Sequence, residues 1–242
     1  MQLLQTEEYE ARGLPREAVS RLAAFADLLA RSPVNVTAIR DCEGIERLHF
    51  LDCLSLLDLP EFHSAGRIID VGSGGGLPAV VLAIALPRME VVAAESVAKK
   101  CGFIAEAAAC LGLTNLQVQC ARAEELGRGP ERESFDVAVS RALASLAVVA
   151  ELTVPLVRVG GSLVVMKGPM SDQERTSGDN ALAILGAPGL CGKQVWPFAG
   201  AENRWLYVAS KTRPTPSAYP RRPGVPEKRP LGQARRSRGG AT

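Results

Sequence analysis

The sequence predicts an α/β fold built on a mostly parallel seven-stranded sheet with helices on both faces. Two observations support this prediction: apolar strand-like runs alternate with helix-like segments between residues 67 and 211, and a glycine-rich turn joins the first strand of that series to its first helix. Such alternation is typical of parallel sheets, whose crossover helices cover the faces of the sheet. The 242 residues, 47% of them hydrophobic, can form one large domain with a substantial core.

The expected strands are short apolar runs bounded by turn residues. They cover residues 68–71, 89–94, 116–120, 135–140, 162–166, 193–197 and 204–211. Helices are expected between them at residues 77–86, 99–111, 146–157 and 180–185. The last two strands follow one another without a helix, which predicts a terminal antiparallel hairpin.

The N-terminal segment does not follow this alternation and instead predicts two helices. Apolar residues recur at helical spacing over residues 16–31. A second helix is expected over residues 43–58, with His49 and Asp52 on the face opposite its apolar residues. These helices predict a small helical cap over residues 1–62, ahead of a main domain over residues 63–211.

Residues 212–242 differ from the rest of the chain in charge and composition. They contain eight Arg or Lys residues, six Pro residues and one acid, Glu227. The remainder of the chain therefore has a net charge of about −5. Such a segment buries too little apolar surface to offset its ordering entropy, which predicts a basic, disordered Pro/Arg-rich tail. A flexible basic tail suits phosphate-rich polymers; a solubilising tail without a partner is the alternative.

Cysteine usage and hydropathy restrict the class of protein. The six cysteines are scattered and lack a C-x-x-C pair, which argues against a zinc or other metal site and against a disulfide framework. No apolar run reaches the ~20 residues of a membrane helix, and the N-terminus lacks the layout of a signal peptide. We therefore expect a cytoplasmic protein in a reducing compartment, without membrane contact, that acts as a monomer.

The glycine-rich turn is the most informative segment of the chain. Four glycines stand within five positions: Gly72, Gly74, Gly75 and Gly76. Glycine lacks a Cβ, so such a turn lets backbone N–H groups approach a ligand closely. A dinucleotide site needs a further spaced glycine where this chain has Leu77. Asp70, just before the turn, suits a cationic ligand end better than a pyrophosphate. The pattern from Asp70 to Gly76 resembles motif I of the class I S-adenosylmethionine methyltransferases, and a purely structural tight turn in another α/β protein is the alternative.

Polar residues follow the ends of three further strands, where ligands bind in open α/β sheets. Glu95 can accept hydrogen bonds from both hydroxyls of a ribose, as an acid in an NAD site also does. The backbone at Ala123-Glu124 can read an adenine edge. Arg141 presents a charged planar fork for a carboxylate or a phosphate. The alternatives are a surface carboxylate for Glu95, a solvated pair at a helix N-terminus for Glu124-Glu125 and a structural salt bridge for Arg141.

Six short motifs occur in an order that resembles one protein family. They are Asn35-Val36-Thr37, His49-Phe50-Leu51-Asp52-Cys53-Leu54-Ser55, Asp70-Val71-Gly72-Ser73-Gly74-Gly75-Gly76-Leu77-Pro78, Arg122-Ala123-Glu124-Glu125, Ser140-Arg141-Ala142 and Lys167-Gly168. Together they resemble the RsmG (GidB) family, the bacterial 16S rRNA guanine-N7 methyltransferases, over nearly the whole chain. The run from Tyr219 to Leu231 also resembles the C-terminus of many members. The resemblance implies a Rossmann-like class I methyltransferase fold with S-adenosyl-L-methionine as cofactor.

The resemblance also implies where the cofactor binds. By position, the cofactor-binding residues are Gly72, Leu77, Ala123, Glu124 and Arg141, and the chemistry of the neighbouring residues adds Asp70, Gly74 and Glu95. Substrate-binding candidates are His49, Asp52, Lys99 and Lys167. The chain departs from the family at Cys53, where serine is usual, at Ala79, where glycine is usual, and in the turn before Lys99; none of these departures removes a ligand-bearing side chain.

The reaction that the resemblance implies needs no general base. Guanine N7 is a neutral nitrogen with an exposed lone pair, so it can attack a sulfonium methyl without first losing a proton. Holding nitrogen, methyl and sulfur in line then supplies most of the rate, and no catalytic residue is nominated. The sequence also lacks an Asn-Pro-Pro-Tyr-type motif for exocyclic amino methylation.

The expected partner is 16S rRNA in the small ribosomal subunit. Aromatic residues that can stack on bases make up only 5% of the chain, and the main part of the chain is acidic. We therefore expect an assembled ribosomal particle as substrate rather than free rRNA. Two alternatives stay open: a class I methyltransferase that acts on a small molecule or a protein, and a non-catalytic ribosome-assembly factor that binds S-adenosylmethionine.

Overall fold

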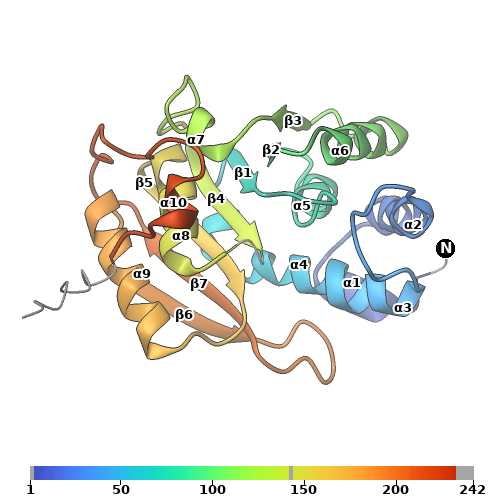
Figure 1. Cartoon of the computed structure of the whole chain (residues 1–242). Coiled ribbons are helices and arrows are strands. Elements are labelled where there is room, and N and C mark those ends of the chain that lie inside the picture. Colours follow the sequence, from blue (N-terminus) through green and yellow to red (C-terminus); the bar gives the residue numbers. More distant parts are fainter. Residues whose placement is uncertain (1–2, 142–143, 233–242) are drawn as a thin grey trace, which may run out of the picture.

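The computed structural model describes residues 3–141 and 144–232. Its centre is a seven-stranded sheet with the strand order β3-β2-β1-β4-β5-β7-β6 (Figure 1). The first five strands pair in parallel, and β7 runs antiparallel between β5 and β6. This arrangement confirms the predicted fold. The strands are β1 (Arg67–Val71), β2 (Glu90–Glu95), β3 (Leu116–Cys120), β4 (Phe135–Arg141), β5 (Val157–Lys167), β6 (Leu190–Val195) and β7 (Arg204–Ser210).

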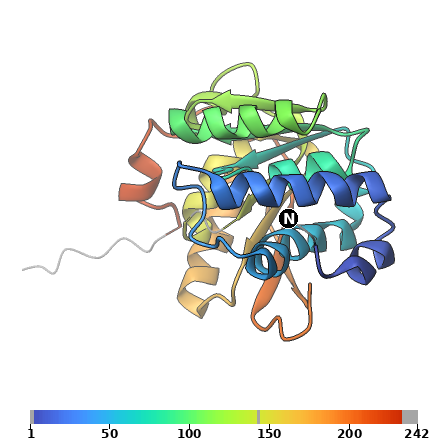
Figure 2. The same cartoon turned by 90° about the vertical axis from the view of Figure 1, so that its right-hand side faces the viewer.

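Helices cover both faces of the sheet, because successive residues of a strand point to opposite sides. Ile68 and Val91 face a core shared with α2, α5 and α6, whereas Ile69 and Val92 face a core covered by α7 and α8. Figure 1 shows these two layers, and in Figure 2 α2 and α6 lie on the near side. The helices are α1 (Thr6–Ala11), α2 (Arg16–Arg31), α3 (Cys42–Ile45), α4 (Asp52–Leu54), α5 (Ala79–Ala85), α6 (Ala98–Cys110), α7 (Ala123–Leu126), α8 (Leu146–Thr153), α9 (Asp172–Leu185) and α10 (Val225–Lys228).

The N-terminal helices pack against α5 and against one another. Phe25 of α2 stacks on Phe50, with the ring centroids 5.7 Å apart. The fully buried carboxylate of Glu46 accepts hydrogen bonds from the backbone N–H groups of Leu4 and Gln5, both at 2.8 Å. These contacts fix the start of the chain to the segment that precedes α4.

The helix predicted over residues 43–58 is not continuous. After α3 the chain forms a π-helical turn (Glu46–Leu51), then α4 and a 3₁₀ turn (Ser55–Asp58). Single π turns are often found at functional sites. Here His49 lies within that turn and Asp52 directly follows it, and both line the same cavity.

α9 is longer than its apolar pattern predicts, since it begins at Asp172 rather than near residue 180. The Ser171 side chain caps the helix by accepting a hydrogen bond from the backbone N–H of Glu174 at 3.2 Å. The first turns are polar, so a cap rather than hydrophobic periodicity marks where this helix starts.

The prediction of a disordered tail is wrong for residues 212–232, which pack against α7 and α8 and include α10 (Figure 1). The Arg132 guanidinium donates hydrogen bonds to the backbone carbonyls of Thr215, at 2.6 Å, and Tyr219, at 2.7 Å. Polar side chains of the main domain thus satisfy the backbone of this Pro-rich segment, which composition alone does not reveal. Residues 233–242, the rest of the predicted tail, lie outside the described residues.

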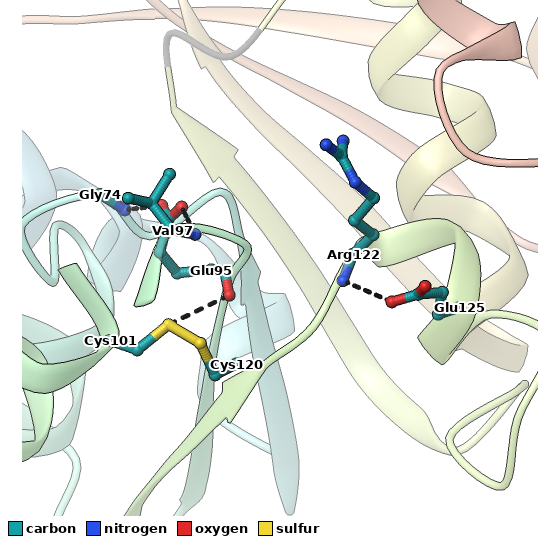
Figure 3. The surroundings of a disulfide bond; sticks show 7 residues. All are labelled: Gly74, Glu95, Val97, Cys101, Cys120, Arg122 and Glu125. Atoms are coloured by element: carbon teal, nitrogen blue, oxygen red, sulfur yellow. Dashed lines mark hydrogen bonds between the residues drawn. A yellow bond between two sulfur atoms is a disulfide. The ribbon is translucent and has the colours of Figure 1, made fainter. Parts of the chain in front are cut away.

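A disulfide joins Cys101 of α6 to Cys120 at the end of β3 (Figure 3). The two cysteines are 19 residues apart in the sequence, and the fold brings them together. The scattered spacing, which argues against a disulfide framework, therefore misses this pair. Among the described residues, no helix has the length and apolar character needed to cross a bilayer.

Candidate active site

Two cavities open at the carboxyl ends of the parallel strands. The glycine-loop cavity, of about 320 Å³, is lined by Gly72, Gly74, Glu95, Ala123 and Arg141 among others. The Trp205 cavity, of about 370 Å³, is lined by His49, Asp52, Arg141, Arg204 and Trp205 among others. Arg141 lines both cavities. It is the last residue of β4, so the central strand of the sheet ends between the two cavities.

The glycine loop needs its glycines for conformation and for space. Gly72, Gly74 and Gly76 have φ values of +79°, +57° and +81°, a region that other residues rarely adopt. A Cβ on Gly75 would stand 2.9 Å from the backbone oxygen of Val36. The loop therefore passes close beneath the N-terminal cap, and its backbone is left open toward the cavity.

Glu95 connects the glycine loop to the end of β2. One carboxylate oxygen accepts a hydrogen bond from the Gly74 N–H at 2.9 Å, and the other accepts one from the Val97 N–H at 2.8 Å (Figure 3). Each oxygen keeps a free lone pair, and the side chain lines the cavity. A carboxylate held in this way can accept further hydrogen bonds from two neighbouring hydroxyl groups.

Asp70 lies behind the glycine loop rather than in the cavity. Its side chain is fully buried, and one oxygen accepts a hydrogen bond from the backbone N–H of Ala79 at 3.1 Å. The other oxygen has no hydrogen-bond partner among the described residues. Burial raises the pKa of Asp70 to about 7, although the hydrogen bond from the Ala79 N–H opposes that shift. In this structure the carboxylate supports the loop from below and touches neither cavity.

The far wall of the glycine-loop cavity comes from α7 and the C-terminal segment. Ala123 and Glu124 line it, but the Glu124 carboxylate accepts a hydrogen bond from the Gly224 N–H at 2.9 Å. The side chain of Glu124 thus holds the C-terminal segment in place at the edge of the cavity. Lys100 and Glu227 also line this cavity; the sequence pattern did not single them out as cofactor contacts.

Two of the sequence-predicted residues lie elsewhere. Leu77 is buried in the hydrophobic core beside α5 and lines neither cavity. Lys99 is exposed in the first turn of α6 and also lines neither cavity. Ala142, the last residue of one family motif, lies outside the described residues.

A charge cluster joins three elements in the Trp205 cavity. The Asp52 carboxylate accepts a hydrogen bond from Arg141 at 3.4 Å and forms an ion pair with Nε of Arg204 at 3.2 Å. Burial raises the pKa of Asp52, and the two guanidinium groups counteract part of that shift. The cluster thereby ties the cap, β4 and β7 together around one carboxylate.

His49 lies beside this cluster but is not placed to exchange protons near neutral pH. Its Nε2 is 2.7 Å from the Thr37 hydroxyl and its Nδ1 is 3.0 Å from the Leu48 carbonyl oxygen. Burial, assisted by the nearby Arg141, lowers the pKa of His49 to about 4. The imidazole is therefore neutral at pH 7.

The remaining wall of the Trp205 cavity comes from β5 and β7. Trp205 stacks on Tyr207, with the ring centroids 5.9 Å apart and the planes 14° from parallel. Lys167 also lines the cavity, and its ammonium pairs with Glu174 at 3.1 Å. Arg204 and Trp205 were not predicted as site residues; the only sequence signal was an Arg-Trp pair at the start of the last expected strand.

The arrangement fits a nucleoside-containing methyl donor. The glycine-loop cavity offers open backbone, a strand-end carboxylate for a ribose and an arginine for a carboxylate, and it adjoins a second cavity with an aromatic wall. Among the described residues, no cluster of three or more His, Cys, Asp or Glu side chains is arranged to hold a metal ion. Fold and site together define a class I S-adenosylmethionine-dependent methyltransferase. The fold is shared with the solved structure of the S-adenosylmethionine-dependent methyltransferase SibL in its apo form, with a TM-score of 0.56 and 17% identity over 82% of this chain and 74% of that one.

Sequence comparison gives the family. The model of the family described as rRNA small subunit methyltransferase G, GidB, matches residues 19–193. The chain is 42% identical to the ribosomal RNA small subunit methyltransferase G of Moorella thermoacetica, over 90% of this chain and 92% of that protein. It is 44% identical to the protein of the same name from Rubrobacter xylanophilus, over 89% and 85% of the two chains. The protein belongs to the rRNA small subunit methyltransferase G family.

Proposed function

We propose that this protein transfers a methyl group from S-adenosylmethionine to N7 of a guanine in 16S rRNA of the small ribosomal subunit. One observation supports the proposal most directly: Arg141 lines both cavities. A methyl donor in the glycine-loop cavity and a base in the Trp205 cavity would therefore meet at the end of β4. The names of the relatives support rRNA of the small subunit as the substrate class, and ribosomes would place this activity in the cytoplasm.

In the proposed donor site, each wall of the glycine-loop cavity binds a different part of S-adenosylmethionine. Glu95 accepts hydrogen bonds from the ribose hydroxyls, since both of its oxygens keep a lone pair. The backbone at Ala123-Glu124 faces the adenine, and Arg141 holds the methionine carboxylate. S-adenosylmethionine supplies an electrophilic methyl group on a sulfonium, and the protein supplies its orientation.

In the proposed acceptor site, Trp205 and Asp52 select the base. Proteins recognise unpaired RNA bases by stacking on aromatic rings and by hydrogen bonds to the base edges. Trp205 offers an indole already supported by Tyr207. The Asp52 carboxylate can accept from N1–H and the exocyclic amino group of guanine, whereas adenine has no hydrogen at N1. The cavity therefore favours guanine.

The proposed reaction uses no protein base. Guanine N7 already carries a free lone pair, so the protein has only to align this nitrogen with the methyl group of the donor. The site agrees with this, because His49 is neutral at pH 7 and already hydrogen-bonded on both ring nitrogens. Lys167 at the cavity and Lys99 on the adjoining surface are proposed to contact RNA phosphates. An assembled small subunit, rather than free rRNA, is proposed as the substrate.

The test is methyl transfer to a defined RNA. The full chain is incubated with labelled S-adenosylmethionine and with small subunits from cells that lack the enzyme, and modified guanines are mapped by borohydride–aniline cleavage. Label in 16S rRNA with cleavage at one guanine is expected. Cofactor binding without label in RNA would overturn the proposed substrate, and label without cleavage would overturn the N7 assignment. Equal labelling of free rRNA would overturn the preference for the assembled subunit.

A variant pair tests the base site. Trp205→Ala removes the aromatic wall, and stacking of about 1–3 kcal/mol per base predicts a 5- to 150-fold lower kcat/KM for the RNA. Its affinity for S-adenosylmethionine, measured by calorimetry, should stay within twofold of the parent. Trp196→Ala is the matched control, because Trp196 is 66% exposed and lines neither cavity. Equal losses in the two variants would contradict the placement of the base.

A further inference from the structure

We propose that Cys101 and Cys120 form a thiol–disulfide modification site that sets the affinity of the glycine-loop cavity for its cofactor. The site would react by exchange with a low-molecular-weight thiol or a protein dithiol. This inference rests on the proposed function in one respect: an enzyme acting on ribosomes works in a reducing compartment, where disulfides are usually transient and regulatory.

The disulfide connects the two segments that flank the cavity. Cys120 is the last residue of β3 and is directly opposite Glu95 in the parallel pairing of β2 with β3. The residues that follow it, from 121 to 124, line the cavity, as do Glu95, Ser96 and Lys100 on the other side. Cys101 lies next to Lys100 in the first turns of α6. The bond therefore links one wall of the cavity to the other (Figure 3).

The sulfur of Cys101 has two alternative partners. It is bonded to Cys120, and it lies 3.2 Å from the backbone carbonyl oxygen of Glu95. A disulfide sulfur bears no hydrogen, so this second contact becomes a hydrogen bond only when Cys101 is a thiol. Reduction would thus replace a covalent link to β3 by a weak hydrogen bond to the end of β2. The residue that gains it is Glu95, whose carboxylate is proposed to hold the ribose.

The disulfide can be reached by an external thiol, and the exchange conserves atoms and electrons. Cys120 is exposed whereas Cys101 is buried, so an incoming thiolate attacks the sulfur of Cys120 and releases Cys101, which takes up a proton. A second thiolate then attacks the external sulfur of the mixed disulfide and releases Cys120, which is protonated in turn. Overall, two external thiols become one disulfide while the protein gains two thiols.

The tethered form should bind the cofactor more tightly. With the disulfide closed, residues 121–124 are held at a fixed position relative to residues 95–100, and a preorganised site loses less freedom when its ligand binds. We expect S-adenosylmethionine to bind the disulfide form about fivefold more tightly, at the lower end of common coupling between sites. By linkage, saturating cofactor must shift the thiol–disulfide equilibrium toward the disulfide by the same factor.

The test measures both directions of this coupling without RNA. The full chain is equilibrated in glutathione buffers of graded composition, with and without saturating S-adenosylmethionine. The fraction of Cys101–Cys120 disulfide is read by alkylation and mass spectrometry, and the affinity of each form for S-adenosylmethionine is read by calorimetry. A fivefold shift in both measurements is expected. Equal affinities together with an unmoved equilibrium, or no disulfide in any buffer, would overturn the inference.

Two variants separate the pair from other thiols. Cys120→Ser should bind the cofactor like the reduced form in every buffer. Cys110→Ser is the matched control on α6, because Cys110 is an exposed free cysteine outside the pair, and it should keep the full redox response. If instead Cys110→Ser loses the response and Cys120→Ser keeps it, the site is misassigned. Failure of the proposed rRNA activity would appear separately, as cofactor binding without methyl transfer.

Discussion

Arg221→Ala tests how the C-terminal segment is held to the main domain. Glu151 of α8 is completely buried, and it accepts three hydrogen bonds from Arg221. The backbone N–H donates at 2.9 Å, Nε at 2.8 Å and Nη2 at 2.5 Å. Truncation to alanine removes both guanidinium contacts with Glu151 and leaves the carboxylate with only the backbone donor. It also removes the hydrogen bond from Nη2 to the Arg229 carbonyl oxygen at 2.7 Å.

The magnitude follows from the burial of the carboxylate. Removing one partner of a buried ion pair costs about 3–5 kcal/mol, because the other charge is left without compensation. Because the backbone hydrogen bond is retained, the expected loss is about 3 kcal/mol. For a chain of this size, that loss corresponds to a fall in Tm of about 6–12 °C.

Equilibrium unfolding in urea measures the effect, and two further variants interpret it. Arg222→Ala removes an exposed neighbouring arginine and should change the free energy of unfolding by less than about 0.5 kcal/mol. Replacing Glu151 and Arg221 together by methionine removes both charges and should recover most of the loss. A loss below about 1 kcal/mol for Arg221→Ala would refute the reasoning. Calorimetry should also show weaker cofactor binding in Arg221→Ala. The C-terminal segment that Arg221 holds in place includes Glu227, which lines the glycine-loop cavity.

Three further predictions concern the glycine loop and its surroundings. Gly72→Asp should abolish cofactor binding, because its side chain would enter the cavity. Aspartate adopts positive φ more often than most residues, so the φ of +79° should cost about 1–3 kcal/mol and leave the fold largely intact; an unchanged affinity by calorimetry would contradict the position of the loop. Asp70 has a pKa raised to about 7, because the fold favours its neutral, protonated form. The contribution of Asp70 to the free energy of unfolding is therefore complete below about pH 4 and is lost as the pH rises through 7. Asp70→Asn should therefore gain stability relative to the parent between pH 4 and 7, by up to about 4 kcal/mol. If the difference in the free energy of unfolding between variant and parent, measured in urea, stays constant across that range, this pKa is excluded. Because the pKa of His49 is about 4, the methylation rate should be independent of pH from 6.5 to 8.5 in both the parent and His49→Gln. A rate that rises with pH in the parent but not in His49→Gln would show that His49 acts as a base.

Local sequence patterns predict the sheet but not the elements that owe their position to tertiary contacts. The central strands contain short buried apolar runs, such as residues 91–94 of β2 and 163–166 of β5, and hydrophobicity locates these runs. The polar start of α9 depends on its cap at Ser171. The order of residues 212–232 depends on Arg132 and Glu151, which contact this segment from more than 60 positions away in the chain.

The same distinction applies to the site. Gly72, Glu95 and Arg141 could be singled out because parallel strands end at one edge, so each residue after a strand falls near the others. Arg204 and Trp205 could not, because they reach the site from the antiparallel strand β7. Leu77 is a different case: its position in the motif predicts a cofactor contact, and because its side chain fills the core beside α5, only its backbone is left to make that contact.

These differences follow from the separate structural origins of the two cavities. The glycine-loop cavity is built mainly on the ends of β1, β2 and β4 and on the turn after β3, which the α/β fold always brings together. The Trp205 cavity is built from the N-terminal cap, the end of β5 and the antiparallel strand β7. Asp52 joins the two parts, because its carboxylate contacts Arg141 of β4 and Arg204 of β7 at once. A displacement of the cap would therefore move the proposed base contact and the shared arginine together, so the position of the cap and the alignment of the methyl donor would be physically coupled.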